Sequence, residues 1–379
     1  MSQVRDVAIV GAGLLGLAAG RALTAQGSDV VLLDQAEIGH EGAGSKGSCR
    51  IFRLGYPDPF YVAAARQAGE LWRQLEAESG RAILLPAPQL SFGTGLPAVH
   101  AAMTKAGAPC ELLPASEVER RFPAIWTGGP ALLEPDSCVT AADQALAALA
   151  DGIADIRTGI RVASLADDGR LVTLRTSRGP VTARVAIITA GPWSGGLLET
   201  LGVGLPSRPT LEQVAYLKPA TAATPATPAT AASQRVPIFM CHGTRTPYGL
   251  PVPGSPLYKI GIHPSGPIAD PDARDQRADE YLVARLTEVA RTFLPGYDPV
   301  PAATERCIYD STPDEDFVVD RVGNVVIGCG TSGHGFKFGP LFGEWLAALA
   351  TGQPGESADQ RFALNRFART ASAPQRCRG

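Results

Sequence analysis

The stretch DVAIVGAGLLGLAAGRALTAQGSDVVLLD, residues 6–34, decides the fold of this chain. Its apolar residues 7–10 have the length and the flanking glycines of a buried strand. Three glycines follow, then apolar residues at helical spacing, and then a second apolar run at residues 30–33. The order predicted is therefore strand, glycine turn, helix and second strand.

The glycines of this turn, Gly11, Gly13 and Gly16, are spaced as G-x-G-x-x-G. The first allows a tight bend, the second lets the backbone approach a pyrophosphate, and the third lets the helix pack on the strand. Asp34 ends the second strand, where a carboxylate can hold ribose hydroxyls. The stretch therefore predicts a dinucleotide-binding unit with these four residues at the cofactor.

FAD and NAD both fit this fingerprint, and a later strand helps to choose between them. Residues 183–191, ARVAIITAG, end at Gly191, yet no second G-x-G-x-x-G opens an independent nicotinamide-binding unit. FAD is therefore favoured as the resident cofactor, and Gly191 is assigned to its site.

Length and composition exclude several classes of protein. The chain has 379 residues and a net charge of -3, which suggests two or three domains and gives no reason to propose nucleic acid as a partner. It lacks both a secretory signal pattern and a long apolar run, so we expect a cytoplasmic protein without membrane spans. Seven cysteines without a CxxC pair argue against a disulfide framework and against a metal site.

The remaining pattern predicts a chain folded from separated pieces. Helices are expected at residues 58–78, 141–150 and 278–294, and a strand at residues 257–263. The Pro/Ala/Thr-rich segment 218–234 reads as a flexible insertion.

The fold class expected is α/β, with a Rossmann-like FAD-binding domain built from discontinuous segments and an α+β substrate domain with an antiparallel sheet. The FAD-binding domain is assigned to residues 1–82, 140–207 and 314–372, and the substrate domain to residues 83–139 and 208–313.

A second glycine-rich turn lies in VVIGCGTSGHGFKFGPLFGEWLAALATG, residues 325–352. A strand leads into the turn and a helix of about three turns leaves it. A helix N-terminus stabilises negative charge, which accumulates on the ring system of a reduced flavin. His334 and Lys337 lie three apart, so they project from one side if the turn is helical.

Four motifs resemble the monomeric sarcosine oxidases and N-methyltryptophan oxidases, within the D-amino-acid-oxidase-like flavoenzymes. They are GSCRIFRLGY (47–56), YKIGIH (258–263), CIYDSTPDEDFVVD (307–320) and GHGFKFGP (333–340), and the resemblance spans nearly the whole chain. It implies a monomeric FAD-dependent oxidase of CH–NH donors that acts on a small amino-acid-like molecule and reduces oxygen to hydrogen peroxide.

The resemblance also implies roles for cofactor-site residues. Cys307, which alone would be taken for a packed core cysteine, matches the residue whose sulfur bonds covalently to the 8α-methyl group of FAD. Arg50 matches an arginine beneath the flavin ring, and Lys46 stands where the family commonly has a histidine. The turn residues assigned to the cofactor are Gly333, His334, Gly335 and Phe336.

Catalytic and substrate-binding roles follow from the same resemblance. Lys259 matches the lysine that promotes reaction with oxygen, a task that suits a fixed ammonium group because charge develops on oxygen. Arg53 and Lys337 would hold the substrate carboxylate. The positions that match the lining of the substrate pocket are Tyr56, Tyr248, His263 and Tyr309. For the tyrosines, ordinary core packing stays open, and for the cations, surface ion pairs stay open.

The reaction expected is oxidation of the C–N bond of sarcosine or another N-methyl amino acid to an imine. The ending FKFGPLFGEWLAALA also leans toward covalent flavin oxidases of cyclic imino acids. Two further alternatives are a flavin dehydrogenase with another electron acceptor and a non-catalytic FAD-binding protein.

Overall fold

The computed structural model describes residues 3–220, 236–273, 275–352 and 360–370. The chain divides into two compact units. Unit 1 comprises residues 1–46, 146–209 and 308–379, and unit 2 comprises residues 47–145 and 210–307. Residues 221–234 of the expected flexible insertion lie outside the described residues.

The strands of unit 1 form a mixed sheet. They are β1 (Arg5–Val10), β2 (Val30–Leu33), β9 (Ile156–Arg157), β10 (Val162–Asp167), β11 (Val172–Thr176), β12 (Gly179–Ile188), β18 (Val318–Val322) and β19 (Val325–Cys329). The order β10-β11-β12-β1-β2-β9 runs through the sheet, while β19 pairs with β12 and β18. The pairs β1–β2, β1–β12, β2–β9 and β12–β19 are parallel. The strand, glycine turn, helix and parallel strand predicted for residues 6–34 are confirmed.

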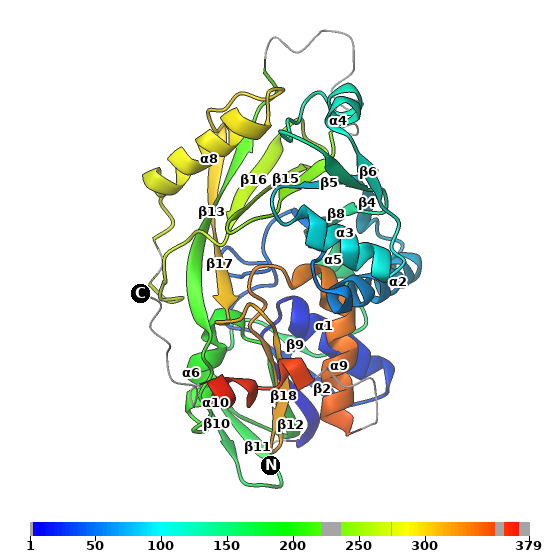
Figure 1. The fold of residues 1–379 in the computed structure, drawn as a ribbon. Helices are drawn as coiled ribbons and strands as arrows, with labels where there is room; N and C mark the ends of the chain where they lie inside the picture. Colours follow the sequence, from blue (N-terminus) through cyan, green and yellow to red (C-terminus); the bar gives the residue numbers. More distant parts are fainter. Residues whose placement is uncertain (1–2, 221–235, 274, 353–359, 371–379) are drawn as a thin grey trace. The chain divides into compact units, whose positions relative to one another are not determined.

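Helices cover this sheet, and two of them pack closely on each other (Figure 1). The helices of unit 1 are α1 (Leu14–Ala25), α6 (Ser194–Glu199), α9 (Gly339–Thr351) and α10 (Arg366–Thr370), with the 3-10 turns η1 (Gly191–Trp193), η2 (Phe336–Phe338) and η3 (Gln360–Phe362). A Cβ atom on Gly343 of α9 would lie 2.6 Å from the carbonyl oxygen of Ala18 in α1. Only a glycine allows the two helices to approach this closely.

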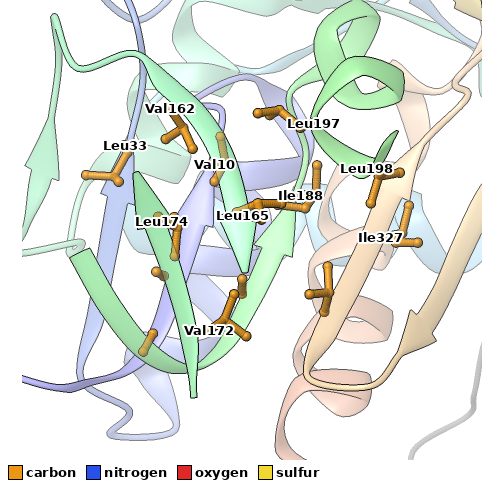
Figure 2. Packing of buried hydrophobic residues seen from close by; sticks show 14 of the residues in the cluster. Val10, Leu33, Val162, Leu165, Val172, Leu174, Ile188, Leu197, Leu198 and Ile327 are labelled. Atoms are coloured by element: carbon orange, nitrogen blue, oxygen red, sulfur yellow. The ribbon is translucent and has the colours of Figure 1, made fainter. Parts of the chain in front are cut away.

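One core cluster of unit 1 lies on the sheet face that α6 covers. Figure 2 shows apolar side chains of parallel and antiparallel strands meeting there, among them Val10, Leu174 and Ile188, with Leu197 and Leu198 of α6 packed against them. Burial on both faces explains why β1 and β12 end in continuous apolar runs rather than alternating patterns.

Unit 2 contains a large sheet and a small one. The large sheet has the order β17-β13-β16-β15-β14-β5-β7-β6 and the small one the order β3-β8-β4. The strands that lie wholly in unit 2 are β3 (Cys49–Phe52), β4 (Leu84–Pro86), β5 (Gln89–Phe92), β6 (Glu111–Leu113), β7 (Ala131–Glu134), β8 (Cys138–Ala141), β14 (Ile238–Cys241), β15 (Thr246–Pro251) and β16 (Tyr258–His263). The boundary between the two units falls within the other two strands, β13 (Arg208–Leu217) and β17 (Ala303–Ser311). The large sheet is mostly antiparallel, as expected, but β5 and β14 pair in parallel.

The helices of unit 2 have clear sequence causes. They are α2 (Pro59–Ser79), α3 (Leu96–Lys105), α4 (Ala115–Arg121) and α8 (Glu280–Phe293), and α5 (Ala142–Ala150) continues from unit 2 into unit 1. Asp58 caps α2 by accepting the N–H of Phe60, and Gly80 ends that helix in the left-handed conformation. In α8 the buried residues Leu282, Leu286, Val289 and Ala290 recur at helical spacing and pack into the core of unit 2.

Residues 47–82, assigned from the sequence to the FAD-binding domain, lie in unit 2. The reason is pairing that the local sequence does not reveal. Strand β3 pairs with β8, and α2 packs against α3, and both partners belong to unit 2. The domain roles of the two units stay predictions.

The described parts of the chain contain no helix with both the length and the apolar character needed to span a bilayer. Within the same residues, no cluster of three His, Cys, Asp or Glu side chains is arranged to hold a metal ion.

Candidate active site

The glycine turn after β1 admits no side chain at two of its positions. Gly11 has a φ of 103°, and a Cβ atom there would lie 2.8 Å from the carbonyl carbon of Thr189. A Cβ atom on Gly16 would collide with the carbonyl oxygen of Gly11 and lie 2.7 Å from Oγ1 of Thr189. These contacts bring β1, α1 and the end of β12 together, because Thr189 Oγ1 also donates to the carbonyl oxygen of Val10 at 3.0 Å.

The N-terminus of α1 is suited to an anion. Its N-cap, Gly13, makes no side-chain cap bond, and the first turn carries no acidic residue. The N–H of Leu14 donates to Oγ of Ser45 at 3.1 Å, and a Cβ atom on Gly13 would lie 3.3 Å from the same oxygen. Neutral glycines at a positive helix end fit the pyrophosphate of a dinucleotide.

Asp34 holds the same turn from the end of β2. Its Oδ2 accepts the N–H of Ala12 at 2.6 Å, and its Oδ1 accepts the N–H of Ala36 at 3.0 Å. Each carboxylate oxygen can accept a second hydrogen bond, so the side chain can also serve ribose hydroxyls. Gly191 follows β12 with a φ of 52° and begins η1. Together these residues of unit 1 fit the adenosine diphosphate part of FAD.

Replacing Gly16 with alanine is expected to give a folded protein with little bound flavin, or an insoluble one, because the new methyl group displaces the backbone of Gly11. The ratio of flavin to protein absorbance in the purified variant measures this loss. Gly196→Ala in α6 is a matched control in the same unit, since a Cβ atom there meets no atom within 4 Å and the backbone is not left-handed. A Gly16→Ala protein with full flavin content would contradict the assignment.

The second glycine-rich turn of unit 1 is anchored by Asp310, a residue that sequence reasoning missed. Its buried carboxylate accepts the N–H groups of Gly330 at 2.7 Å and Thr331 at 3.0 Å, and the Thr331 hydroxyl at 2.6 Å. Burial raises the pKa of this carboxyl, while the hydrogen bonds from Thr331 and Gly330 lower it. The signal available in the sequence was an acid in a strand directly after Tyr309.

Tyr309 is packed against this turn. A Cβ atom on Gly333 would collide with the tyrosine ring, so the glycine makes room for it. Gly333 has a φ of 73°, which also favours glycine. The ring and the turn residues assigned to the cofactor are therefore held together in unit 1.

His334 and Lys337 are linked by a hydrogen bond rather than by a regular helical turn. The turn ends in η2, which holds Phe336 and Lys337, and the Lys337 ammonium donates to the carbonyl oxygen of His334 at 2.6 Å. The imidazole Nε2 of His334 lies 3.0 Å from the carbonyl oxygen of Glu315, and its ring centroid lies 4.7 Å from that of Phe317. Lys337 is 4% exposed.

Lys46 is also buried in unit 1. Its ammonium lies 2.8 Å from Oε2 of Glu41, whose side chain is exposed. Lys46 follows Ser45, which receives the α1 N–H. The replacement of the family histidine thus places a charged group next to the candidate cofactor turn.

In unit 2, one face of β16 carries two of the predicted positions, Lys259 and His263. Strands β13, β16 and β15 lie side by side (Figure 1). Lys259 pairs with Tyr216 of β13, and its ammonium lies 5.6 Å from the Tyr216 ring centroid. Tyr248 pairs with Gly261 and covers it, because a Cβ atom on Gly261 would lie 2.8 Å from Cε1 of that ring. The Tyr248 ring therefore lies on the face that Gly261 shares with Lys259 and His263.

Opposing effects act on the pKa of the Cys307 thiol. Burial raises this pKa above the ordinary value, the positive charges of Lys259 and Arg50 oppose this rise, and the charges of Glu212 and Glu305 add to it. These two cations and the thiol are thus brought within electrostatic reach of one another in unit 2. Arg50 also donates to the carbonyl oxygen of Cys49 at 2.9 Å. A thiol beside two cations is better placed to form a thiolate than one in an apolar core.

Tyr216 is a neighbour of this group that the sequence did not single out. Its hydroxyl donates to Oε2 of Glu305 at 2.6 Å. Burial and this hydrogen bond raise the phenol pKa far above its ordinary value, so the group stays neutral. The only sequence signal for Tyr216 was the alternation of side chains between the two faces of strand β13.

Arg53 and Tyr56 form a second group in unit 2. The guanidinium carbon of Arg53 lies 3.9 Å from the ring centroid of Tyr56, and Nη1 donates to the carbonyl oxygen of Gly55. The Tyr61 ring stacks on Tyr56 with centroids 5.1 Å apart. Burial raises the pKa of Tyr56 to about 12, against the opposing charge of Arg53. The phenol is thus neutral at ordinary pH, and the guanidinium is held over its face.

Comparison with known proteins shows similarity to amino-acid oxidases. The chain is 33% identical to human peroxisomal sarcosine oxidase over 364 residues, which cover 91% of this chain and 92% of the relative. It is 32% identical to monomeric sarcosine oxidase of Bacillus sp. (strain NS-129) over 386 residues, with 97% of each chain covered. The solved open form of NikD, described as an unusual amino acid oxidase essential for nikkomycin biosynthesis, matches with a TM-score of 0.83 and 26% identity over 96% of this chain and 98% of that one.

The family comparison covers most of the chain. The model of the FAD dependent oxidoreductase family DAO matches residues 6–349, which include both glycine turns. The relatives of about 30% identity and the fold agree with this match, so the chain is an FAD-dependent amine or amino-acid oxidase. It belongs to the DAO family of FAD-dependent oxidoreductases.

Proposed function

We propose that this protein oxidises a secondary amino acid, sarcosine or another N-methyl amino acid, at the carbon next to nitrogen. The observation that carries the proposal is the group of Arg50, Lys259 and Cys307, in which the charges of the two cations act on the partly buried thiol of β17. Support comes from two sarcosine oxidases above 30% identity over more than nine-tenths of this chain. By the printed name of one of them, we also propose that the protein acts as a monomer.

The substrate carboxylate is assigned to Arg53 and Lys337. A guanidinium can donate two parallel hydrogen bonds to a carboxylate, and an ammonium adds a point charge. The Tyr56 ring holds the Arg53 guanidinium in one plane, which reduces the conformational entropy lost when substrate binds.

The amine must be neutral to lose a hydride equivalent from its carbon, and cationic side chains near the bound nitrogen lower its pKa. FAD, when bound, supplies the electron acceptor for this step and the electron donor for oxygen. The substrate loses two electrons and two protons and becomes an imine, which water hydrolyses. Oxygen takes up two electrons and two protons and leaves as hydrogen peroxide, while the Lys259 ammonium stabilises the negative charge that develops on it.

We further propose that Cys307 forms a thioether with the 8α-methyl group of FAD. The S–C bond replaces one S–H and one C–H bond, and oxygen accepts the two electrons released. The bond requires the thiolate, and the charges of Lys259 and Arg50 offset part of the rise in thiol pKa that burial causes.

Acid precipitation tests the thioether. The wild-type pellet is expected to retain its yellow colour, whereas Cys307→Ser is expected to release all of its flavin into the supernatant. Absorbance of both fractions measures the partition. Cys241→Ser, which changes another partly buried cysteine of unit 2, serves as a control and should retain the flavin in the pellet. Release of all the flavin from the wild-type protein would show that no thioether forms.

A second candidate substrate is a cyclic imino acid. It is favoured by the likeness to NikD, the amino acid oxidase essential for nikkomycin biosynthesis, at a TM-score of 0.83. A cyclic imino acid carries the same carboxylate and secondary amine, so the same residues would bind it.

Anaerobic mixing tests the proposed function. The purified protein is mixed with sarcosine, other N-methylated amino acids, L-proline, L-pipecolate and primary amino acids, and the loss of flavin absorbance is followed. Rapid bleaching by N-methyl amino acids is expected, followed by recovery of colour and hydrogen peroxide on admission of air. Bleaching by cyclic imino acids alone would transfer the proposal to the second candidate. Slow recovery in air would indicate a dehydrogenase, and no bleaching by any compound would end the proposal.

A further inference from the structure

Behind Arg53 lies a buried carboxylate that none of the proposed steps uses. Glu134, the last residue of β7, is 1% exposed. Its Oε1 accepts hydrogen bonds from Nε2 of Gln89 at 2.8 Å and from Oγ of Ser91 at 2.6 Å. Its Oε2 accepts the N–H of Gly55 at 2.8 Å. All three donors are neutral, so the charge is held by hydrogen bonds alone.

The hydrogen bonds continue beyond Ser91. The Ser91 hydroxyl donates its only proton to Glu134, so its oxygen can only accept further hydrogen bonds. This oxygen lies 3.1 Å from Nε2 of Gln89 and 3.1 Å from Nε2 of His242. His242 therefore carries its proton on Nε2. Burial and the nearby charge of Arg53 lower its pKa to about 3, so the imidazole is neutral and the network keeps one protonation pattern at ordinary pH.

Gly55 connects this network to the guanidinium. Its N–H is held by Glu134, and its carbonyl oxygen accepts from Nη1 of Arg53. A Cβ atom on Gly55 would lie 2.7 Å from the carboxyl carbon of Glu134. The peptide between Arg53 and Tyr56 is thus fixed on one side by the carboxylate and on the other by the guanidinium. Both charges also act on the phenol of Tyr56, with opposite signs.

We propose that Glu134 is the positioning residue of the carboxylate-binding arginine: by holding the Gly55 peptide it fixes the Arg53 guanidinium over Tyr56 and thereby sets the affinity for substrates that carry a carboxylate. The inference rests on the proposed function, because it assumes that Arg53 binds that carboxylate. Glu134 contributes nothing to electron transfer. Ser91 and His242 hold Glu134 in place.

The test compares sarcosine with sarcosinamide, which keeps the secondary amine and lacks the negative charge. In Glu134→Gln, one carboxylate oxygen becomes an NH₂ group that faces a donor, so the Gly55 peptide loses its fixed position. The KM for sarcosine is expected to rise about 10-fold, as for the loss of one hydrogen bond to a charged group. The kcat for sarcosine and both constants for sarcosinamide are expected to stay within about twofold. Ser91→Ala should shift the sarcosine KM in the same direction by a smaller factor.

A double-mutant cycle separates positioning from general destabilisation. In an Arg53→Met background the further change Glu134→Gln is expected to leave the sarcosine KM unchanged, because no guanidinium remains to be positioned. Glu76→Gln is the matched control in unit 2, since Glu76 also accepts two backbone N–H groups, those of Ile83 and Leu84. It should leave both substrates unaffected.

The outcomes distinguish the two levels of the proposal. Equal KM increases for sarcosine and sarcosinamide in Glu134→Gln, or an undiminished effect in the Arg53→Met background, would overturn the positioning role and leave the proposed function intact. If Glu134→Gln does not fold, the KM values of Ser91→Ala for sarcosine and sarcosinamide, alone and in the Arg53→Met background, test the positioning role instead. A wild-type protein that oxidises neither compound nor any other N-methyl amino acid would instead overturn the proposed function.

Discussion

Replacing Lys259 with methionine is expected to slow the reaction of the reduced protein with oxygen by about 100- to 1000-fold, the usual cost of removing one fixed electrostatic stabiliser. Lys259 is 8% exposed, and its ammonium lies beside the Tyr216 ring. In that position it can stabilise charge developing on oxygen without prior reorganisation. Methionine keeps the length and the apolar stem of the side chain while removing the charge.

Two stopped-flow experiments separate this effect from damage to the amine site. Anaerobic reduction by sarcosine should change far less than reoxidation in air-saturated buffer. Lys105→Met, which removes an exposed ammonium at the end of α3 in the same unit, should alter neither rate. Equal slowing of reduction and reoxidation in Lys259→Met would show that the lysine supports the fold of β16 rather than the oxygen reaction.

The second large effect is expected at the carboxylate-binding cations. Arg53→Met should weaken binding of an amino-acid substrate by at least about 100-fold, because two charge-assisted hydrogen bonds are lost. Lys337→Met should weaken it by about 10- to 100-fold, because one ammonium contact is lost. The measurement is the substrate concentration that gives half-maximal anaerobic bleaching.

A carboxylate without an amine, such as acetate, provides an independent reading. Its dissociation constant from flavin difference spectra should rise in both variants and stay unchanged in Lys105→Met. Unchanged binding of sarcosine and acetate to Lys337→Met would remove that lysine from the carboxylate site. The same result in Arg53→Met would remove the basis for the role given to Glu134.

The local fold was predictable where short-range chemistry decides it. Three glycines and an acid at fixed spacing predicted the turn between β1 and α1, and the helix expected at residues 58–78 agrees with α2 within one residue at each end. Pairing between distant segments was not predictable. The assignment of residues 47–82 differed because β3 pairs with β8, a strand nearly ninety residues further along the chain.

In the candidate site too, the residues placed by local sequence were predictable, and those held by distant partners were not. Lys259 and His263 alternate in the strand expected at residues 257–263 and so share a face, and Tyr248 covers that face because Gly261 has no side chain. Asp310 and Glu134 were missed, since their partners come from other strands and turns. A buried acid in a strand is visible in the sequence, but the donors that stabilise it are not. The chemical roles of the site residues stay predictions.

The close packing of α1 on α9 has a consequence for biosynthesis. Helix α1 ends at Ala25, whereas α9, whose Gly343 fits against Ala18, begins at Gly339 and is made only after all the residues between them. At ordinary elongation rates the apolar face of α1 waits on the order of half a minute for its partner. Unit 1 therefore completes its fold only after synthesis of unit 2, and a nascent chain halted before α9 is expected to require chaperones to avoid aggregation.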